Sequence, residues 1–148
     1  MTTFDYDPTG RLWRMRREGV STEFLFDGDA LVAEYNSSGQ LTRRYLHGDQ
    51  IDEPWVEYQG SAVNAPARRY LHSDHRGSII AHSHTAGNTQ AILSYDAYGN
   101  AGVNNQGRFG FAGQLFFADT GLYYYKARFY NPRAGRFMQT DPIDTRME

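Results

Sequence analysis

YDPTGRL, at residues 6–12, is the stretch that decides the fold, because its pattern returns along the chain. It recurs as YNSSGQL at 35–41 and, in part, as YDAYGN at 95–100. A second phrase is repeated almost letter for letter, as RRYLHGD at 43–49 and RRYLHSD at 68–74. Repeats of roughly 20–30 residues are typical of repeat architectures, because a single unit cannot bury its apolar face alone. The sequence therefore predicts a series of β-repeats, with catalysis a secondary question.

The composition agrees with a β-rich chain. Its 148 residues leave room for one domain with one core. Tyr, Phe and Trp make up 15% of the residues, and 15 glycines accompany them. Aromatic side chains suit pleated strands, and glycine suits tight turns. The absence of cysteine excludes disulfides and thiolate metal sites. The formal net charge of -2 gives no overall basic footprint for nucleic acid, so no nucleic-acid partner is expected.

Short strand-like runs alternate with turn residues over most of the chain. Residues 59–66 predict a loop, residues 96–107 are rich in turn residues, and residues 1–8 predict a turn-like start. Short helical turns are expected near residues 131–135, but no segment has a sustained helical apolar stripe. The predicted class is all-β, with antiparallel hairpins forming a curved or spiral sheet. The expected strands are 11–17, 22–26, 30–35, 41–46, 52–58, 69–71, 78–83 and 91–95.

The second half of the chain carries a longer set of phrases. They resemble the YD-repeat or RHS (rearrangement hotspot) family, and residues 69–143 look like its RHS repeat-associated core domain. The resemblance divides the chain into YD-repeat hairpins at 1–60, a loop at 61–68, the core domain at 69–143 and a tail at 144–148. The phrases are YLHSDHRGS at 70–78, YDAYG at 95–99, FGFAGQ at 109–114, DTGLYY at 119–124, ARFYNP at 127–132, GRF at 135–137 and DPI at 141–143.

The resemblance implies a structural role. RHS proteins are bacterial β-cocoons that enclose or present a C-terminal toxin and serve bacterial competition, through type VI secretion, toxin complexes or surface display. Because Glu148 follows closely on Pro142, we expect a shell or plug segment without its toxin. The expected partners are a downstream toxin domain in a longer parent, and another YD-repeat chain or a second copy bound through open sheet edges.

The N-terminus lacks the basic and apolar regions of a signal peptide. No apolar run is long enough to span a membrane, so no membrane span is expected. The expected location is therefore outside the bacterial cell or on its surface, reached through a parent chain or a secretion machine.

An alternative implied by the resemblance is an aspartyl self-cleaving module that releases a downstream toxin. Two carboxylates match the family pattern, Asp119 and Asp141, and an aspartyl mechanism needs two carboxylates close enough to share a proton. Two departures from the pattern are Asn131, where Asp is commoner, and Asp144, where Gly is usual. The structural reading of the same residues is that Asp119 starts a turn and Asp141 caps a strand.

Other sites are less favoured by the sequence. The histidines at 72, 75, 82 and 84 do not form a recognisable zinc pattern, and neither a metal nor a cofactor is expected. The tyrosine run 123–125 leaves carbohydrate or cell-surface recognition open as a further alternative, although cross-strand packing is the commoner use of such residues.

Overall fold

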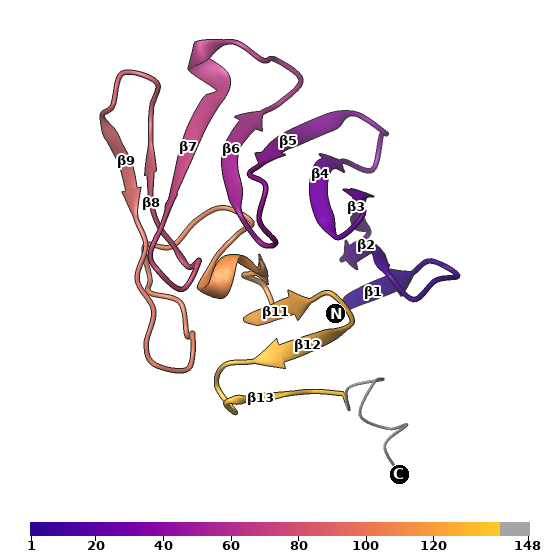
Figure 1. Ribbon diagram of the computed structural model, residues 1–148. Coiled ribbons are helices and arrows are strands. Elements are labelled where there is room, and N and C mark those ends of the chain that lie inside the picture. Colours follow the sequence, from indigo (N-terminus) through magenta and orange to yellow (C-terminus); the bar gives the residue numbers. More distant parts are fainter. Residues whose placement is uncertain (140–148) are drawn as a thin grey trace.

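A computed structural model of the chain describes residues 1–139. Within them, nine antiparallel strands form one sheet in which sequence neighbours are also neighbours in space (Figure 1). Four more antiparallel strands form a second sheet, and the prediction of all-β hairpin repeats is confirmed. The first sheet contains β1 Thr2–Tyr6, β2 Leu12–Arg17, β3 Val20–Asp27, β4 Ala30–Tyr35, β5 Leu41–His47, β6 Pro54–Gln59, β7 Arg68–Ser73, β8 Ile79–Ser83 and β9 Thr89–Ile92. The second contains β10 Leu115–Phe117, β11 Leu122–Tyr125, β12 Arg128–Asn131 and β13 Arg136–Phe137, and there are two 3₁₀ turns, η1 Ala65–Ala67 and η2 Phe111–Gly113.

The repeated phrase of the sequence is a repeated turn. In turns 7–11, 36–40, 74–78, 84–88 and 96–100, the first N–H donates to the fifth C=O, and the fourth residue's N–H donates to the first C=O. These distances lie between 2.8 and 3.1 Å. The fourth residue is always glycine, with φ between +76° and +97°, a conformation that other residues rarely adopt. Four turns begin with Asp or Asn, whose Oδ1 accepts the third and fifth N–H groups at 2.9–3.1 Å.

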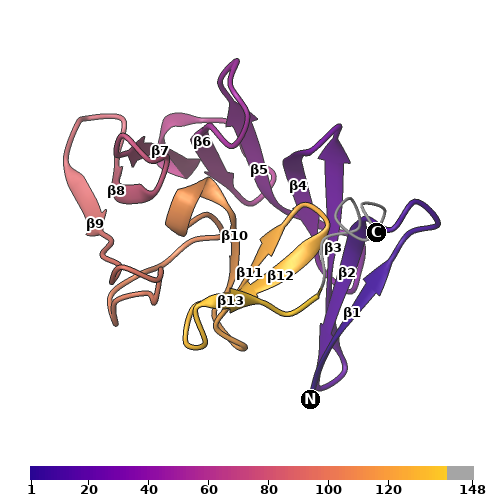
Figure 2. The same ribbon diagram turned by 60° about the horizontal axis from the view of Figure 1, so that its bottom comes forward.

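The nine-stranded sheet is strongly curved, and its concave face is filled by residues 109–137 (Figures 1 and 2). Register shifts interrupt most of its strand pairs, including β1–β2, β4–β5 and β8–β9. Such bulges bend a strand and increase its local twist, which explains the curvature. We call residues 109–137, which contain η2 and the four-stranded sheet, the plug.

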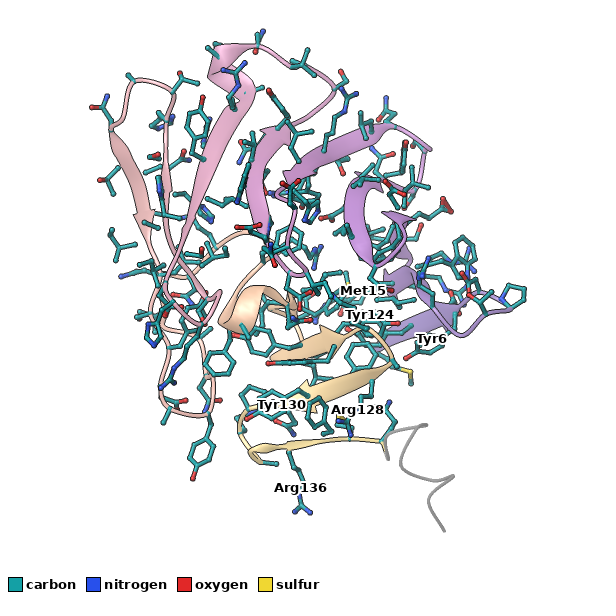
Figure 3. All side chains as sticks on the ribbon, in the orientation of Figure 1. Tyr6, Met15, Tyr124, Arg128, Tyr130 and Arg136 are labelled. Atoms are coloured by element: carbon teal, nitrogen blue, oxygen red, sulfur yellow. The ribbon has the colours of Figure 1, made fainter. Side chains whose placement is uncertain are left out.

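Aromatic side chains join the plug to the sheet. Phe4 of the sheet lies 5.2 Å from Phe117 and 4.6 Å from Phe129 of the plug, measured between ring centroids. Phe24 lies 5.8 Å from Phe117. Figure 3 shows Tyr124 of the plug in the region where the plug meets the sheet, and its hydroxyl accepts the buried N–H of Leu12 at 3.1 Å. Sheet and plug therefore share one hydrophobic core.

Two local predictions were wrong. Residues 1–8 do not begin as a turn, because Thr2–Tyr6 forms strand β1, with Asp5 opposite Arg14 of β2. The Arg14 guanidinium lies 2.8 Å from the Asp5 carboxylate and neutralises its charge within the sheet. Residues 131–135 form no helical turn, since they connect β12 to β13 and the described 3₁₀ turns lie elsewhere.

The nine-stranded sheet does not close on itself: β1 and β9 end its strand order. The division at 61–68 stays a prediction. Within residues 1–139, no helix has the length and apolar character needed to cross a bilayer.

Candidate functional site

Polar chemistry is concentrated where the sheet meets the chain leading into the plug. Glu34 is the one charged residue of strand β4, and it is 2% exposed. Arg108 donates from Nε to Glu34 Oε2 at 3.2 Å and from Nη2 to Oε1 at 3.0 Å. Its Nη1 donates to the carbonyl of Phe116 at 3.0 Å. This forked geometry is the strong form of a guanidinium–carboxylate contact, and it ties the sheet to the plug.

A second buried carboxylate lies nearby. Glu57 of β6 accepts from Arg43 Nη1 at 3.0 Å and from the side-chain amide of Gln59 at 3.3 Å. The Tyr45 hydroxyl of β5 donates a hydrogen bond to the Glu34 carboxylate. Burial, followed by the negative charge of Glu34, raises the pKa of Tyr45 well above its usual value. Each buried carboxylate is thus matched by a guanidinium, which suits a structural junction better than proton transfer.

Asp119 lies in the turn between β10 and β11. Its side chain is 47% exposed and lies 3.6 Å from Arg17 Nη1. It also lines a cavity of about 200 Å³ whose walls include Arg43, Arg108 and Phe117. Asp119 is therefore accessible, beside the Arg17 guanidinium and in a cavity that Arg43 and Arg108 also line, so it could reach a substrate as an acid or base must.

Asp141, the second predicted aspartate, lies outside the described residues. Strand β13 begins opposite Asn131, near the turn that contains Asp119, and runs antiparallel to β12. The chain then runs away from that turn as far as Gln139. The Met138 N–H donates to the Phe129 carbonyl, and the side-chain oxygen of Gln139 accepts the Phe129 N–H. The predicted pairing of the two aspartates stays a prediction.

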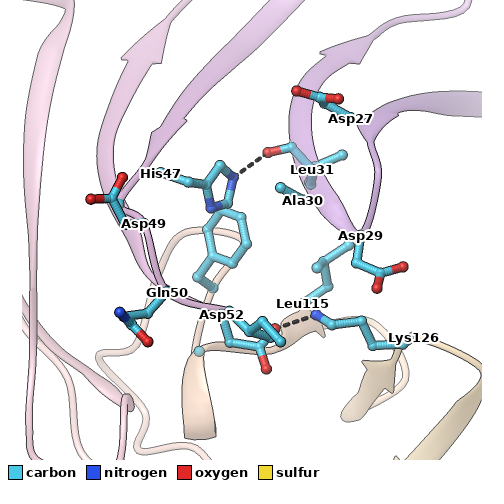
Figure 4. A pocket seen from close by; sticks show the side chains of 14 residues that line it. Asp27, Asp29, Ala30, Leu31, His47, Asp49, Gln50, Asp52, Leu115 and Lys126 are labelled. Carbon is cyan, nitrogen blue, oxygen red and sulfur yellow. Dashed lines mark hydrogen bonds and ion pairs between the residues drawn. The ribbon is translucent and has the colours of Figure 1, made fainter.

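A second cavity, of about 260 Å³, opens between the β3–β4 turn, the β5–β6 loop and the plug (Figure 4). Lys126 of the plug forms an ion pair with Asp52 across it. The His47 ring contacts the Leu31 carbonyl at 2.6 Å between Nε2 and O. Asp27, Asp29 and Asp49 also line this cavity, yet nowhere in residues 1–139 do His, Asp or Glu gather in a group of three suited to a metal ion.

The remaining sequence candidates occupy separate environments. His82 is 4% exposed, on the inner face of the sheet, whereas the exposed ring of His72 contacts Ser83 Oγ at 2.8 Å. Tyr123 and Tyr124 of the tyrosine run are buried in the plug. The Tyr123 hydroxyl donates to the Gly99 carbonyl at 2.8 Å, so these tyrosines contribute packing and hydrogen bonds.

Glu34 and Arg108 were not predicted from the sequence as site residues. One signal for Glu34 was available: it is a carboxylate in the otherwise apolar run ALVAEY, and such a residue needs a buried partner. Nothing in the pattern named Arg108 as that partner, because 74 residues separate the two.

Comparison with known proteins gives a consistent picture. The family model described as Teneurin YD-shell matches residues 1–147. The tRNA nuclease WapA of Bacillus subtilis (strain 168) is 32% identical over 149 residues, which cover 95% of this chain and 6% of WapA. Double-stranded DNA deaminase toxin A of Burkholderia cenocepacia (strain H111) is 30% identical over 172 residues, which cover 96% of this chain and 12% of that protein. The chain thus spans a small fraction of these relatives.

Solved structures share the fold. The crystal structure of TcdB2-TccC3-TEV matches with a TM-score of 0.67 and 20% identity, over 96% of this chain and 8% of that one. The Photorhabdus luminescens Tc holotoxin pore matches with a TM-score of 0.69 and 18% identity, over 97% of this chain and 8% of that one.

Proposed function

Because the chain belongs to the Teneurin YD-shell family, we propose that it is the closing segment of a longer YD shell that encloses or presents a toxin. One observation carries the proposal: residues 109–137 fill the concave face of a curved repeat sheet and share its core. Two relatives that are about one-third identical or slightly less are named as a nuclease and a deaminase toxin. A plug of this kind suits the end of a hollow shell.

The shell would continue through the outer strands of the sheet. Among residues 1–139, strands β1 and β9 each pair with one neighbour only, so each leaves backbone N–H and C=O groups for another strand. The partner is then another stretch of YD repeats, either in a parent chain or in a second molecule. Export from a bacterial cell, with type VI secretion as one route and bacterial competition as its purpose, belongs to the same proposal.

A chimera tests the closing role. In the chimera, this chain replaces the matching segment of the Burkholderia deaminase toxin. Limited proteolysis then measures how fast the remaining parts of that protein are digested. We expect the chimera to resist protease as the parent does. The variant Phe117→Ala, which removes a buried ring of the plug, should lose the resistance, whereas Val103→Ala at a fully exposed position should keep it. The proposal is contradicted if the chimera has native secondary structure and its toxin is nevertheless digested as fast as when this chain is absent.

Self-cleavage is the second candidate. It is favoured by the position of Asp119, exposed beside Arg17 and lining the cavity that Arg43 and Arg108 also line. The chain is extended beyond Glu148 and examined by mass spectrometry for a cut fragment. Asp119→Asn and Asp141→Asn should each abolish the cut, and Asp29→Asn, at an exposed ion pair, should not. An extended chain that stays intact contradicts this role.

A further inference from the structure

A short stretch of chain packs against a buried histidine. We call residues 104–107 the strap, and its last residue, Gly107, lies against the ring of His82 on β8. A Cβ atom at Gly107 would lie 2.9 Å from His82 Cε1 and 3.4 Å from Nε2, so the strap backbone packs directly on the imidazole. Gly107 is itself exposed, whereas His82 is buried.

The strap is fixed near its ends and free between them. Asn105 accepts the Ser94 N–H at 2.8 Å and donates to the Ser94 carbonyl at 2.9 Å. Arg108, the residue after the strap, is held by Glu34. In the part of the chain that the structure describes, the backbones of Gln106 and Gly107 form no hydrogen bond with the sheet.

Cavities lie on both sides of the strap. One has a volume of about 200 Å³ and contains Asp119 and Arg43 in its lining. The other, of about 90 Å³, is lined by Asn105 and Gln106 of the strap. Gly107, Phe116 and Ala118 line both. Gly107 is therefore the one strap residue that borders both cavities.

We propose that the strap is a proton-operated gate: acidification places a positive charge on His82, and residues 106 and 107 move off the imidazole and connect the two cavities. This goes beyond the closing role of the plug, since a plug can close a shell without responding to pH.

The charges around His82 favour that response. Burial lowers the pKa of His82; Glu57 of β6 opposes this shift, and Arg43 of β5 together with Arg69 and His72 of β7 adds to it. Glu57 already accepts hydrogen bonds from Arg43 and Gln59. Arg108, another cation, follows the strap. A buried His82⁺ would therefore be poorly solvated.

Proton linkage gives the direction in which pH shifts the equilibrium between the closed and the open strap. The closed state holds His82 with a lowered pKa, whereas the open state hydrates the ring and returns it toward the ordinary value of 6.5. The open state therefore binds more protons, and the closed state loses stability as the pH falls through that value. Hydrating the ring by moving β7 or β8 would break a ladder of backbone hydrogen bonds, whereas moving Gly107 breaks none that the described residues show.

Thiol labelling tests the gate on the full chain, whose sequence has no cysteine. Leu93→Cys places one thiol at a buried position that lines the smaller cavity, and its labelling rate, corrected for the thiolate fraction, is compared at about pH 7.5 and about pH 5.5. We expect opening to rise about tenfold on acidification, because each unit of pH below the open-state pKa shifts the equilibrium by up to that factor. His82→Gln should remove the rise. The matched control His72→Gln, at an exposed ring of the neighbouring strand, should keep it.

An equal rise in the Leu93→Cys chain with and without His82→Gln, or no rise while His82 is present, overturns the proposal. Where His82→Gln does not fold, the wild type gives the answer by NMR. The His82 ring and the Gly107 amide should then titrate with one midpoint, and a ring that titrates while the amide stays unchanged overturns the gate. These outcomes differ from failure of the chimera, which reports only on the closing role.

Discussion

The nine-stranded sheet and the plug are held together by different kinds of contact. In the sheet, each strand pairs with its neighbour in sequence, and the same five-residue turn recurs along it. Where the plug meets the sheet, the decisive contacts join distant residues, as in the hydrogen bond between Leu12 and Tyr124 and the ion pair between Glu34 and Arg108, the residue that precedes the plug. Local contacts form with little loss of chain entropy, whereas distant ones require most of the fold to be in place. The plug should therefore be the more sensitive of the two to single changes.

The largest difference is expected for buried aromatic residues of the plug. Phe117 is 1% exposed and contacts Phe4, Phe24 and Phe129. Phe117→Ala should lower the free energy of unfolding by about 3–5 kcal/mol, because it removes a ring and leaves a cavity. Ile92→Ala, on the outer strand β9 and 64% exposed, should change it by no more than about 0.5 kcal/mol. Urea unfolding of the full chain measures both, and equal effects would show that the plug is not the sensitive part.

The next effect concerns the ion pair between the two regions. Arg108→Met should cost about 3–5 kcal/mol, because it leaves the Glu34 carboxylate buried without its guanidinium partner. The double variant Glu34→Leu with Arg108→Met should cost less than Arg108→Met alone, since no unpaired charge remains.

A matched control for this pair is Arg11→Met. Arg11 pairs with Asp29 at 3.5 Å, and that carboxylate is 68% exposed. An exposed pair of this kind should contribute less than about 1 kcal/mol. If Arg108→Met and Arg11→Met destabilise the chain equally in urea, the junction is no stronger than a surface contact.

The same contrast between local and distant contacts explains how much the sequence could predict. The turns and strands of the sheet were readable because Asp, Asn and Gly act within five residues, as in turn 7–11. Strand β1 was missed because Asp5 and Asp7 resemble turn residues, and the compensating Arg14 lies on another strand. The partner of Glu34 was also out of reach, because contacts over 74 residues leave no periodic signal. Of the predicted aspartate pair, the structure places Asp119 alone.

The smallest effect tests the sheet through its own turns. Turn 74–78 has Asp74, whose Oδ1 accepts the N–H groups of Arg76 and Ser78 at 2.9 and 3.1 Å. Asp74→Ala should cost about 1 kcal/mol, the typical net value of such hydrogen bonds.

Turn 84–88 has the same backbone bonds, yet among the described residues its first side chain, His84, accepts no N–H of the turn. His84→Asp should therefore stabilise the chain by up to about 1 kcal/mol, as the carboxylate supplies the missing acceptor. His84→Ala is the control and should change little. Stabilisation by alanine as large as by aspartate would mean that the side chain plays no part in these turns, and that the backbone bonds and glycine alone set the geometry of the sheet.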